Sequence, residues 1–231
     1  MVTLQLSSPL DAFQSHLVPW YQTIIVRGQF YVSVRPVPHI VVLAGPNGDG
    51  KSTAAADILR GTLAVDEFVN ADVIARGLSE FRPESVAIEA GRVMLNRLRH
   101  LTSERRNVAF ETTLASRTFA PWIRGLKADG YRFVLVFLCL PEPEIAIARV
   151  GGRVSLGGHF VPPEVIRRRH QGGLHNFFEL YSPLADRWHF YNNAQKPRVL
   201  IADGTNPGSV KIFDQQFWDN ACERSIHARS R

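Results

Sequence analysis

The stretch GPNGDGKST, from Gly45 to Thr53, has the spacing G-x-x-x-x-G-K-[ST] that is typical of a phosphate-binding loop. In such a loop the backbone N–H groups surround the phosphates, and the lysine and the hydroxyl complete the contacts. We expect Lys51 to reach the β- and γ-phosphates of a nucleotide and Ser52 to ligate Mg²⁺. The residues predicted to bind the nucleotide are Gly45, Asn47, Gly48, Asp49, Gly50, Lys51, Ser52 and Thr53.

Asp49 has the wrong charge for a site that holds phosphate. Two unit charges about 4 Å apart repel by about 4 kcal/mol at an effective dielectric constant near 20. Such a repulsion would weaken nucleotide binding by about three powers of ten. It would be relieved if the Asp49 side chain pointed into water or paired with an arginine of the chain. We therefore expect a modest effect on affinity; the alternative is a solvated loop residue without effect.

Two acids further along the chain are predicted to face the same loop. The apolar run HIVVLAG precedes the loop as a buried strand, and KSTAAADILRG follows it as a helix. Asp72 in EFVNAD and Glu111 in NVAFETT each end a predicted strand, and RVLIAD ends in Asp203. Ligands of open α/β sheets bind at the carboxyl ends of the strands, so Asp72 and Glu111 are expected in one crevice. An acid there can hold Mg²⁺ or accept the proton of an attacking hydroxyl, unless it is only a loop residue or helix cap.

A glycine-rich segment flanked by arginines, ARVGGRVSLGGHFVPPEVIRRR, is interpreted as a lid. Small phosphotransferases close such a lid over the nucleotide, which excludes water and brings positive charge to the phosphoryl group in transfer. An exposed basic helix with a flexible loop is the alternative. The candidate lid residues are Arg149, Arg153, Arg168 and Arg169.

The elements that must position these residues alternate between strand and helix from residue 39 onward. This alternation predicts a doubly wound, mostly parallel α/β sheet, the fold of P-loop NTPases of the nucleotide-kinase kind. We expect one domain over residues 38–231, with the lid around 150–170. Residues 1–37 are an extension of unknown role, in which YQTIIVRGQFYVSV is a candidate hairpin turning at Arg27-Gly28. Strands are predicted over 39–45, 67–72, 107–113, 132–140 and 198–203, and helices over 51–61, 83–106, 119–131, 142–154, from about 163, and 209–225.

The composition limits the classes of protein that this chain can belong to. Of 231 residues, 45% are hydrophobic and 21% charged, which is globular composition, and the formal net charge of +6 suits anionic partners. The two cysteines form no disulfide framework and no metal-binding motif. No apolar run approaches the roughly 20 residues of a membrane span, and no signal peptide is evident. We therefore expect a cytoplasmic protein that does not bind membranes.

Several stretches together resemble the zeta toxin-type kinases, P-loop toxins of bacterial toxin–antitoxin pairs, and their relatives. The similar stretches are VVLAGPNGDGKST, FVNADVIA, AFETTLAS, RVGGRVSLGGHFVPPEVIRRR and LYSPLADRWHFYNN, from about residue 39 to 193, with VLIADG beyond. Asp49 departs from the family pattern, which usually has a small residue there. The resemblance implies a kinase that uses ATP or GTP to phosphorylate a hydroxyl of UDP-N-acetylglucosamine, and an antitoxin that blocks the nucleotide site.

The resemblance also implies roles for single residues. Asp72 corresponds to the catalytic acid that activates the sugar hydroxyl, and Lys51 and Ser52 to the nucleotide and Mg²⁺ contacts. Glu111 and Thr112 correspond to the substrate-binding stretch. The lid arginines Arg153, Arg168 and Arg169 correspond by region only.

Two other functions stay open. The first is a polynucleotide or RNA 5′-kinase, which uses the same parts with a basic groove. No cluster of aromatic residues interleaved with basic ones is found, so nucleic acid is not the expected substrate. The second is a nucleotide-binding protein with an impaired site that acts through partner contacts, which Asp49 favours.

Overall fold

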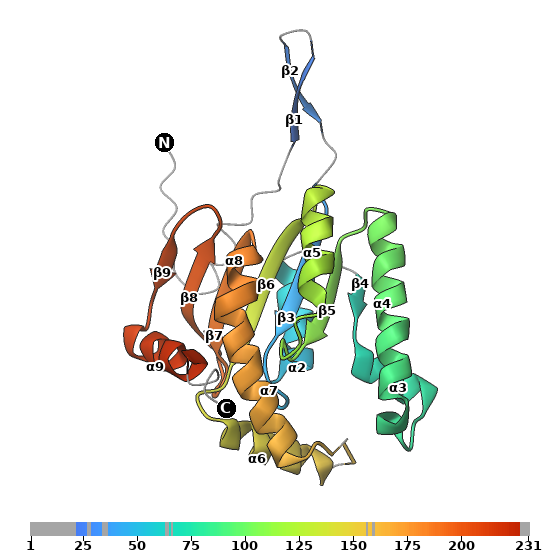
Figure 1. Cartoon of the computed structure of the whole chain (residues 1–231), viewed down its shortest axis with the longest axis vertical. Coiled ribbons are helices and arrows are strands. Elements are labelled where there is room, and N and C mark those ends of the chain that lie inside the picture. Colours follow the sequence, from blue (N-terminus) through green and yellow to red (C-terminus); the bar gives the residue numbers. More distant parts are fainter. Residues whose placement is uncertain are drawn as a thin grey trace.

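The computed structural model describes residues 22–26, 29–33, 37–62, 65, 67–155, 157–158 and 160–226. Its centre is a seven-stranded sheet in the order β4-β5-β3-β6-β7-β8-β9 (Figure 1). The strands from β4 to β7 run parallel, whereas β8 and β9 are each antiparallel to the preceding strand. The strands are β3 (His39–Ala44), β4 (Glu67–Val69), β5 (Val108–Thr112), β6 (Arg132–Cys139), β7 (Arg187–Asn192), β8 (Val199–Thr205) and β9 (Val210–Ile212).

Helices connect the parallel strands, as the alternating pattern predicts. Two of them continue into π-helical turns, and a 3₁₀ turn precedes the longest. The helical elements are α2 (Lys51–Ala56), η1 (Asp57–Thr62), α3 (Ala71–Leu78), η2 (Pro83–Val86), α4 (Ala87–Ser103), α5 (Phe119–Ala128), α6 (Pro143–Val154), α7 (Pro163–Asn176), η3 (Phe177–Tyr181), α8 (Ser182–Leu184) and α9 (Gln215–Ile226).

The central strand β3 is buried on both faces of the sheet because helices cover each of them. Successive side chains of a strand point to opposite faces. Ile40, Val42 and Ala44 therefore pack into one core with apolar residues of α4, α5, α7 and α9. Val41 and Leu43 pack on the other face against α2 and η1. Figure 1 shows the same three-layer arrangement.

Three parts of the fold differ from the prediction. Residues 187–192, for which no strand was predicted, form β7 and pair with β6. Helix α3 was likewise not predicted. The C-terminal segment forms strand β9 before its helix, whereas the prediction was one helix over 209–225. Asp214 explains where α9 begins, since its carboxylate accepts the Phe217 N–H at 2.9 Å.

The predicted hairpin near the N-terminus is confirmed by an antiparallel pair of strands, β1 (Gln22–Val26) and β2 (Gln29–Ser33). They form a two-stranded sheet of their own. The predicted turn at Arg27-Gly28 lies outside the described residues. Within the described ranges, every helix is too short or too polar to cross a bilayer.

Candidate active site

The P-loop connects the end of β3 to the start of α2, as the sequence predicts. Gly50 has φ +87° and Gly48 has φ +78°, backbone conformations that favour glycine. An added Cβ at Gly48 would lie 2.7 Å from the Ala146 carbonyl oxygen of α6, so the loop and this helix are in close contact. The Gly45 N–H donates to the Thr112 carbonyl at 3.2 Å, which ties the loop to the end of β5.

Lys51 turns back over its own loop. Its ammonium nitrogen lies 2.8 Å from the Gly45 carbonyl oxygen, 2.8 Å from that of Pro46 and 2.9 Å from Asp49 Oδ1. The side chain is buried, with the residue 7% exposed. A lysine ammonium has three N–H donors, so the chain itself accepts from all of them.

Asp49 points neither into water nor towards an arginine, so both predicted means of relieving its charge are wrong. The residue is 1% exposed and forms an ion pair with Lys51. Its Oδ1 also accepts the Lys51 backbone N–H at 3.1 Å. Burial raises the pKa of the Asp49 carboxyl to about 6, although the charge and hydrogen bonds of Lys51 oppose the shift. The loop lysine is therefore the partner that compensates this buried acid.

Ser52 and Glu111 meet beside the loop, as the strand-end argument predicts for Glu111. The Ser52 hydroxyl donates to Glu111 Oε2 at 2.9 Å. Burial raises the pKa of Glu111; Lys51 and the Ser52 hydrogen bond oppose the shift, whereas the charge of Asp72 adds to it. Glu111 and Asp72 are thus close enough to interact electrostatically.

Asp72 lies in the first turn of α3 and not at the end of a strand, because β4 already ends at Val69. Asn70 caps this helix: its Oδ1 accepts the N–H of Asp72 at 2.7 Å and that of Val73 at 3.2 Å. The buried Asn70 side chain also hydrogen-bonds Glu111 and so favours the ionised carboxylate. Sequence reasoning missed Asn70, although asparagine before an apolar helical pattern is a cap signal.

The oxygen atoms at this position suit Mg²⁺. Mg²⁺ prefers hard oxygen ligands and usually takes only one or two from the protein, with water and phosphate completing its shell. Ser52 offers an exposed hydroxyl next to the Glu111 carboxylate. No group of three or more His, Cys, Asp or Glu in the described ranges could hold a metal by itself. The donor set therefore fits an ion that arrives with a nucleotide.

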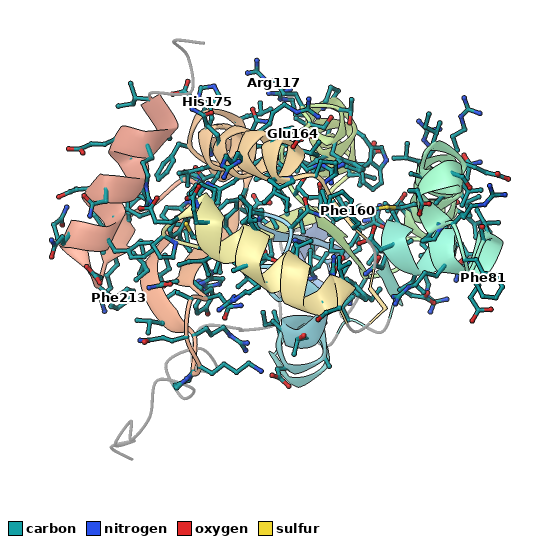
Figure 2. The ribbon with its side chains drawn as sticks, turned by 90° about the horizontal axis from the view of Figure 1, so that it is seen from below. Phe81, Arg117, Phe160, Glu164, His175 and Phe213 are labelled. Carbon is teal, nitrogen blue, oxygen red and sulfur yellow. The ribbon has the colours of Figure 1, made fainter. Side chains whose placement is uncertain are left out.

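The predicted lid corresponds to the C-terminal half of α6, the start of α7 and the segment between them. Of its arginines, Arg169 reaches the P-loop, where its Nη1 donates to Asn47 Oδ1 at 3.1 Å. Arg153 and Arg168 are exposed, and neither forms an ion pair with another described residue. Figure 2, seen from below, shows α6 crossing this edge of the sheet and Phe160 on its side towards α3 and α4.

Arg149, predicted as a lid arginine, binds the loop that follows β7. Its guanidinium donates to the carbonyls of Asn193, at 3.0 Å, and of Ala194. The side-chain amide of Asn193 in turn donates to the backbone carbonyl of Asp49. Arg149 and Asn193 therefore connect α6, the loop after β7 and the P-loop. Asn193 has no motif of its own, so sequence reasoning missed it.

Thr112, predicted to bind substrate, uses its hydroxyl to shape the loop after β5. The hydroxyl accepts the N–H of Leu114 at 3.1 Å. Leu114 is buried with φ +60°, a conformation that is strained for leucine. Asn176 holds this turn by donating to the Leu114 carbonyl at 2.9 Å. This hydrogen bond connects the loop between β5 and α5 to α7.

Asp203 lies away from the site. Strand β8 is antiparallel to β7, so it ends at the side of the sheet where the parallel strands begin. Asp203 pairs with His189, three residues before the end of β7. The strand-end rule for parallel sheets does not extend to a strand that turns back.

A family model described as Zeta toxin matches residues 23–203, most of the chain. The chain belongs to the zeta toxin family. The match begins inside the β1–β2 hairpin, so the resemblance starts earlier than the predicted residue 39. Family membership and the P-loop fold together support a phosphotransferase that binds a nucleotide.

The three proteins described next have low sequence identity to this zeta toxin family member. An uncharacterized protein of Haemophilus influenzae is 26% identical over 130 residues, which are 56% of the chain and 91% of that protein. A crystal structure of AvrRxo1-ORF1:AvrRxo1-ORF2 with sulphate ions has a TM-score of 0.66 at 16% identity. The match covers 81% of the chain but only 64% of the AvrRxo1 chain.

The PezAT chromosomal toxin–antitoxin system of Streptococcus pneumoniae gives a second structural match. Its TM-score is 0.56 at 16% identity, with 84% of this chain and 88% of that chain covered. A further AvrRxo1 structure, determined with ATP, has a TM-score of 0.63 at 17% identity. Likeness at such low identity shows a shared fold.

Proposed function

We propose that the protein is a Mg²⁺-dependent kinase that transfers the γ-phosphoryl group of ATP or GTP to a hydroxyl of a nucleotide sugar such as UDP-N-acetylglucosamine. The observation that carries the proposal is the convergence of Lys51, Ser52, Glu111 and Asp72 on one edge of the sheet. A phosphate loop, a metal-ligand pair and a free acid are the parts that phosphoryl transfer to a hydroxyl needs. The family resemblance supports the nucleotide sugar as acceptor.

In the proposed reaction Asp72 accepts the proton of the acceptor hydroxyl. The hydroxyl oxygen bonds to the γ-phosphorus, the bond from this phosphorus to the bridging oxygen breaks, and ADP or GDP leaves. Lys51 neutralises charge on the β- and γ-phosphates. Mg²⁺, held through Ser52 with Glu111 beside it, would supply further neutralisation of the phosphates when bound.

A protein partner that covers the candidate site belongs to the same proposal. The solved relatives include AvrRxo1-ORF1 with AvrRxo1-ORF2 and the PezAT toxin–antitoxin system. The α3–α4 region, which carries Asp72, exposes large apolar side chains, among them Phe81 at 93%. Figure 2 shows Phe81 at the outer side of this region. An antitoxin would bury such side chains and block the nucleotide site.

A screen for ADP or GDP release tests the proposed function directly. The purified protein is incubated with Mg²⁺ and ATP or GTP, and with nucleotide sugars, nucleosides or RNA 5′-ends as acceptors. We expect acceptor-dependent release with a nucleotide sugar. Release only with RNA 5′-ends would instead identify a polynucleotide kinase. Nucleotide binding without release in any arm would favour a protein with an impaired site that acts through a partner.

The lid arginines are predicted to act mainly in the transition state. Neutralising Arg153, or Arg168 together with Arg169, should lower kcat by about 10²-fold and change the affinity for ATP much less. The reason is that negative charge redistributes over the phosphoryl oxygens only during transfer. Steady-state kinetics with varied ATP separate kcat from KM.

Arg167 provides the matched control for this prediction, because it lies beside Arg168 but pairs with Glu144 on the surface at 3.2 Å. The Arg167→Gln variant loses one positive charge, as neutralising Arg153 does, and should keep its kcat. A pure rise in KM for ATP with unchanged kcat in the lid variants would contradict the role. Such a result would mean that the lid arginines only form a docking surface for ATP.

A further inference from the structure

The acid in the P-loop competes with a nucleotide for the loop lysine. All three N–H donors of Lys51 are taken by Gly45, Pro46 and Asp49. A phosphate oxygen can therefore bond the ammonium only by displacing one of these acceptors. Asp49 is the one of these three acceptors that carries a charge, so its contact adds the attraction of an ion pair to the hydrogen bond. The Asp49 carboxylate thus binds the Lys51 ammonium in the way that a phosphate group would.

The loop is shaped to hold this carboxylate in place. Gly45 leaves room for it, since an added Cβ there would lie 1.9 Å from Asp49 Oδ2 and 2.3 Å from the Leu138 carbonyl oxygen. Oδ2 is buried and has no hydrogen-bond partner among the described residues. Among the residues that the structure describes, Lys51 is the one that compensates the charge. The contact is therefore strong while Lys51 stays, and the acid is uncompensated once Lys51 leaves.

We propose that Asp49 is an internal competitor of the nucleotide phosphates, which holds Lys51 in the free protein and releases it when a nucleotide binds. This proposal deepens the proposed function, because it concerns the affinity and regulation of the same site. Nucleotide binding then includes breaking a buried ion pair, which lowers the affinity. The competing acid also makes the affinity depend on pH.

The pH dependence follows from the groups that face Asp49. Of the described residues, Lys51 of α2 is the cation that acts on Asp49, Glu111 of β5 adds negative charge, and the Cys139 thiol of β6 lies within electrostatic reach. The side chain of Asn193, from the loop after β7, does not titrate. When phosphates take Lys51, Asp49 loses its compensating charge and gains a second anion nearby. Its pKa must rise, so nucleotide binding takes up a proton.

The rise in the pKa of Asp49 determines how the affinity for a nucleotide changes with pH. In the free protein burial raises the pKa of Asp49 to about 6. Loss of the Lys51 charge raises this pKa further in the proposed complex. Well below pH 6 the acid is neutral in both states and does not compete. Between pH 6 and the pKa of the complex, binding requires protonation, so affinity falls as pH increases. The affinity for a nucleotide should therefore be greater at pH 6 than at pH 8.

Calorimetric titration of the full-length protein with Mg²⁺ and a non-hydrolysable ATP analogue tests the proposal. Asp49→Asn and Asp49→Ala should bind about 5- to 30-fold more tightly than the wild type at pH 8, and the advantage should shrink at pH 6. Titration in two buffers of different ionisation enthalpy counts protons. The wild type should take up more protons at pH 8 than Asp49→Asn, by up to about one.

Asp57→Asn is the matched control, since Asp57 is an exposed acid one helical segment beyond the loop. It loses one negative charge but should change affinity less than about twofold, as expected for a screened surface charge. Thermal unfolding establishes that each variant is folded. Weaker or unchanged binding by both folded Asp49 variants, or equal proton uptake, would overturn the proposal. The titration requires no acceptor, so failure of the kinase screen leaves this test intact.

Discussion

We expect the Lys51→Ala variant to lose phosphoryl transfer by about 10³-fold or more. In the proposed reaction the Lys51 ammonium neutralises the phosphates that separate, and no other cation of the P-loop stretch can replace it. ADP release with the acceptor found in the screen measures the loss. Wild-type turnover in the folded variant would refute the assignment of Lys51.

The structure indicates that Lys51→Ala should also destabilise the fold. From the sequence alone, the Lys51 charge was expected at the phosphates and outside the core, so the fold should be unaffected. Lys51 is in fact buried against Asp49. Removing one partner of a buried ion pair costs about 3 to 5 kcal/mol, because a charge is left uncompensated. Protonation of Asp49 would reduce that cost at low pH.

The double variant Asp49→Asn with Lys51→Ala is therefore the matched control. It removes both charges, so its free energy of unfolding at pH 8 should exceed that of Lys51→Ala alone. Its phosphoryl transfer should remain as low. If the double variant recovered activity, the defect of Lys51→Ala would come from the uncompensated charge of Asp49. It would then not come from a missing phosphate contact.

The fold was largely predictable because its signals are local. The P-loop lies between an apolar strand and a helix, and each of these is a continuous pattern in the sequence. Strand β7 was missed because Arg187 and His189 interrupt its apolar run. Helix α3 was missed because it is only eight residues long and starts directly after a three-residue strand. Such short elements are specified by tertiary packing more than by pattern.

The site was predictable only where topology brings residues together. Glu111 and Ser52 meet because parallel strands end at one edge, which follows from the strand order. The same rule could not be applied to Asp203, since nothing local indicates that β8 turns back. The partner of Asp49 was missed for a different reason. The side chains of Asp49 and Lys51 could adopt many conformations in a loop, and the buried geometry decides that the lysine turns inward.

We expect the Asp72→Asn variant to transfer phosphoryl groups about 10²- to 10⁴-fold more slowly, the usual contribution of a general base. Nucleotide binding should stay nearly unchanged, because Lys51 and Ser52 provide the proposed nucleotide contacts. The fold should tolerate the change. Asp72 is exposed in the first turn of α3, where an acid contributes about 0.3 to 1 kcal/mol with the helix dipole.

Single-turnover kinetics at saturating nucleotide separate the possible roles of Asp72. Glu80→Gln, an exposed acid just beyond the end of α3, is the matched control for loss of one charge and should react at the wild-type rate. If Asp72→Asn lost nucleotide affinity but kept its rate at saturation, Asp72 would be a metal or nucleotide ligand. Because asparagine preserves the shape of the side chain but cannot take up the proton, a slow rate with intact binding assigns the proton to Asp72.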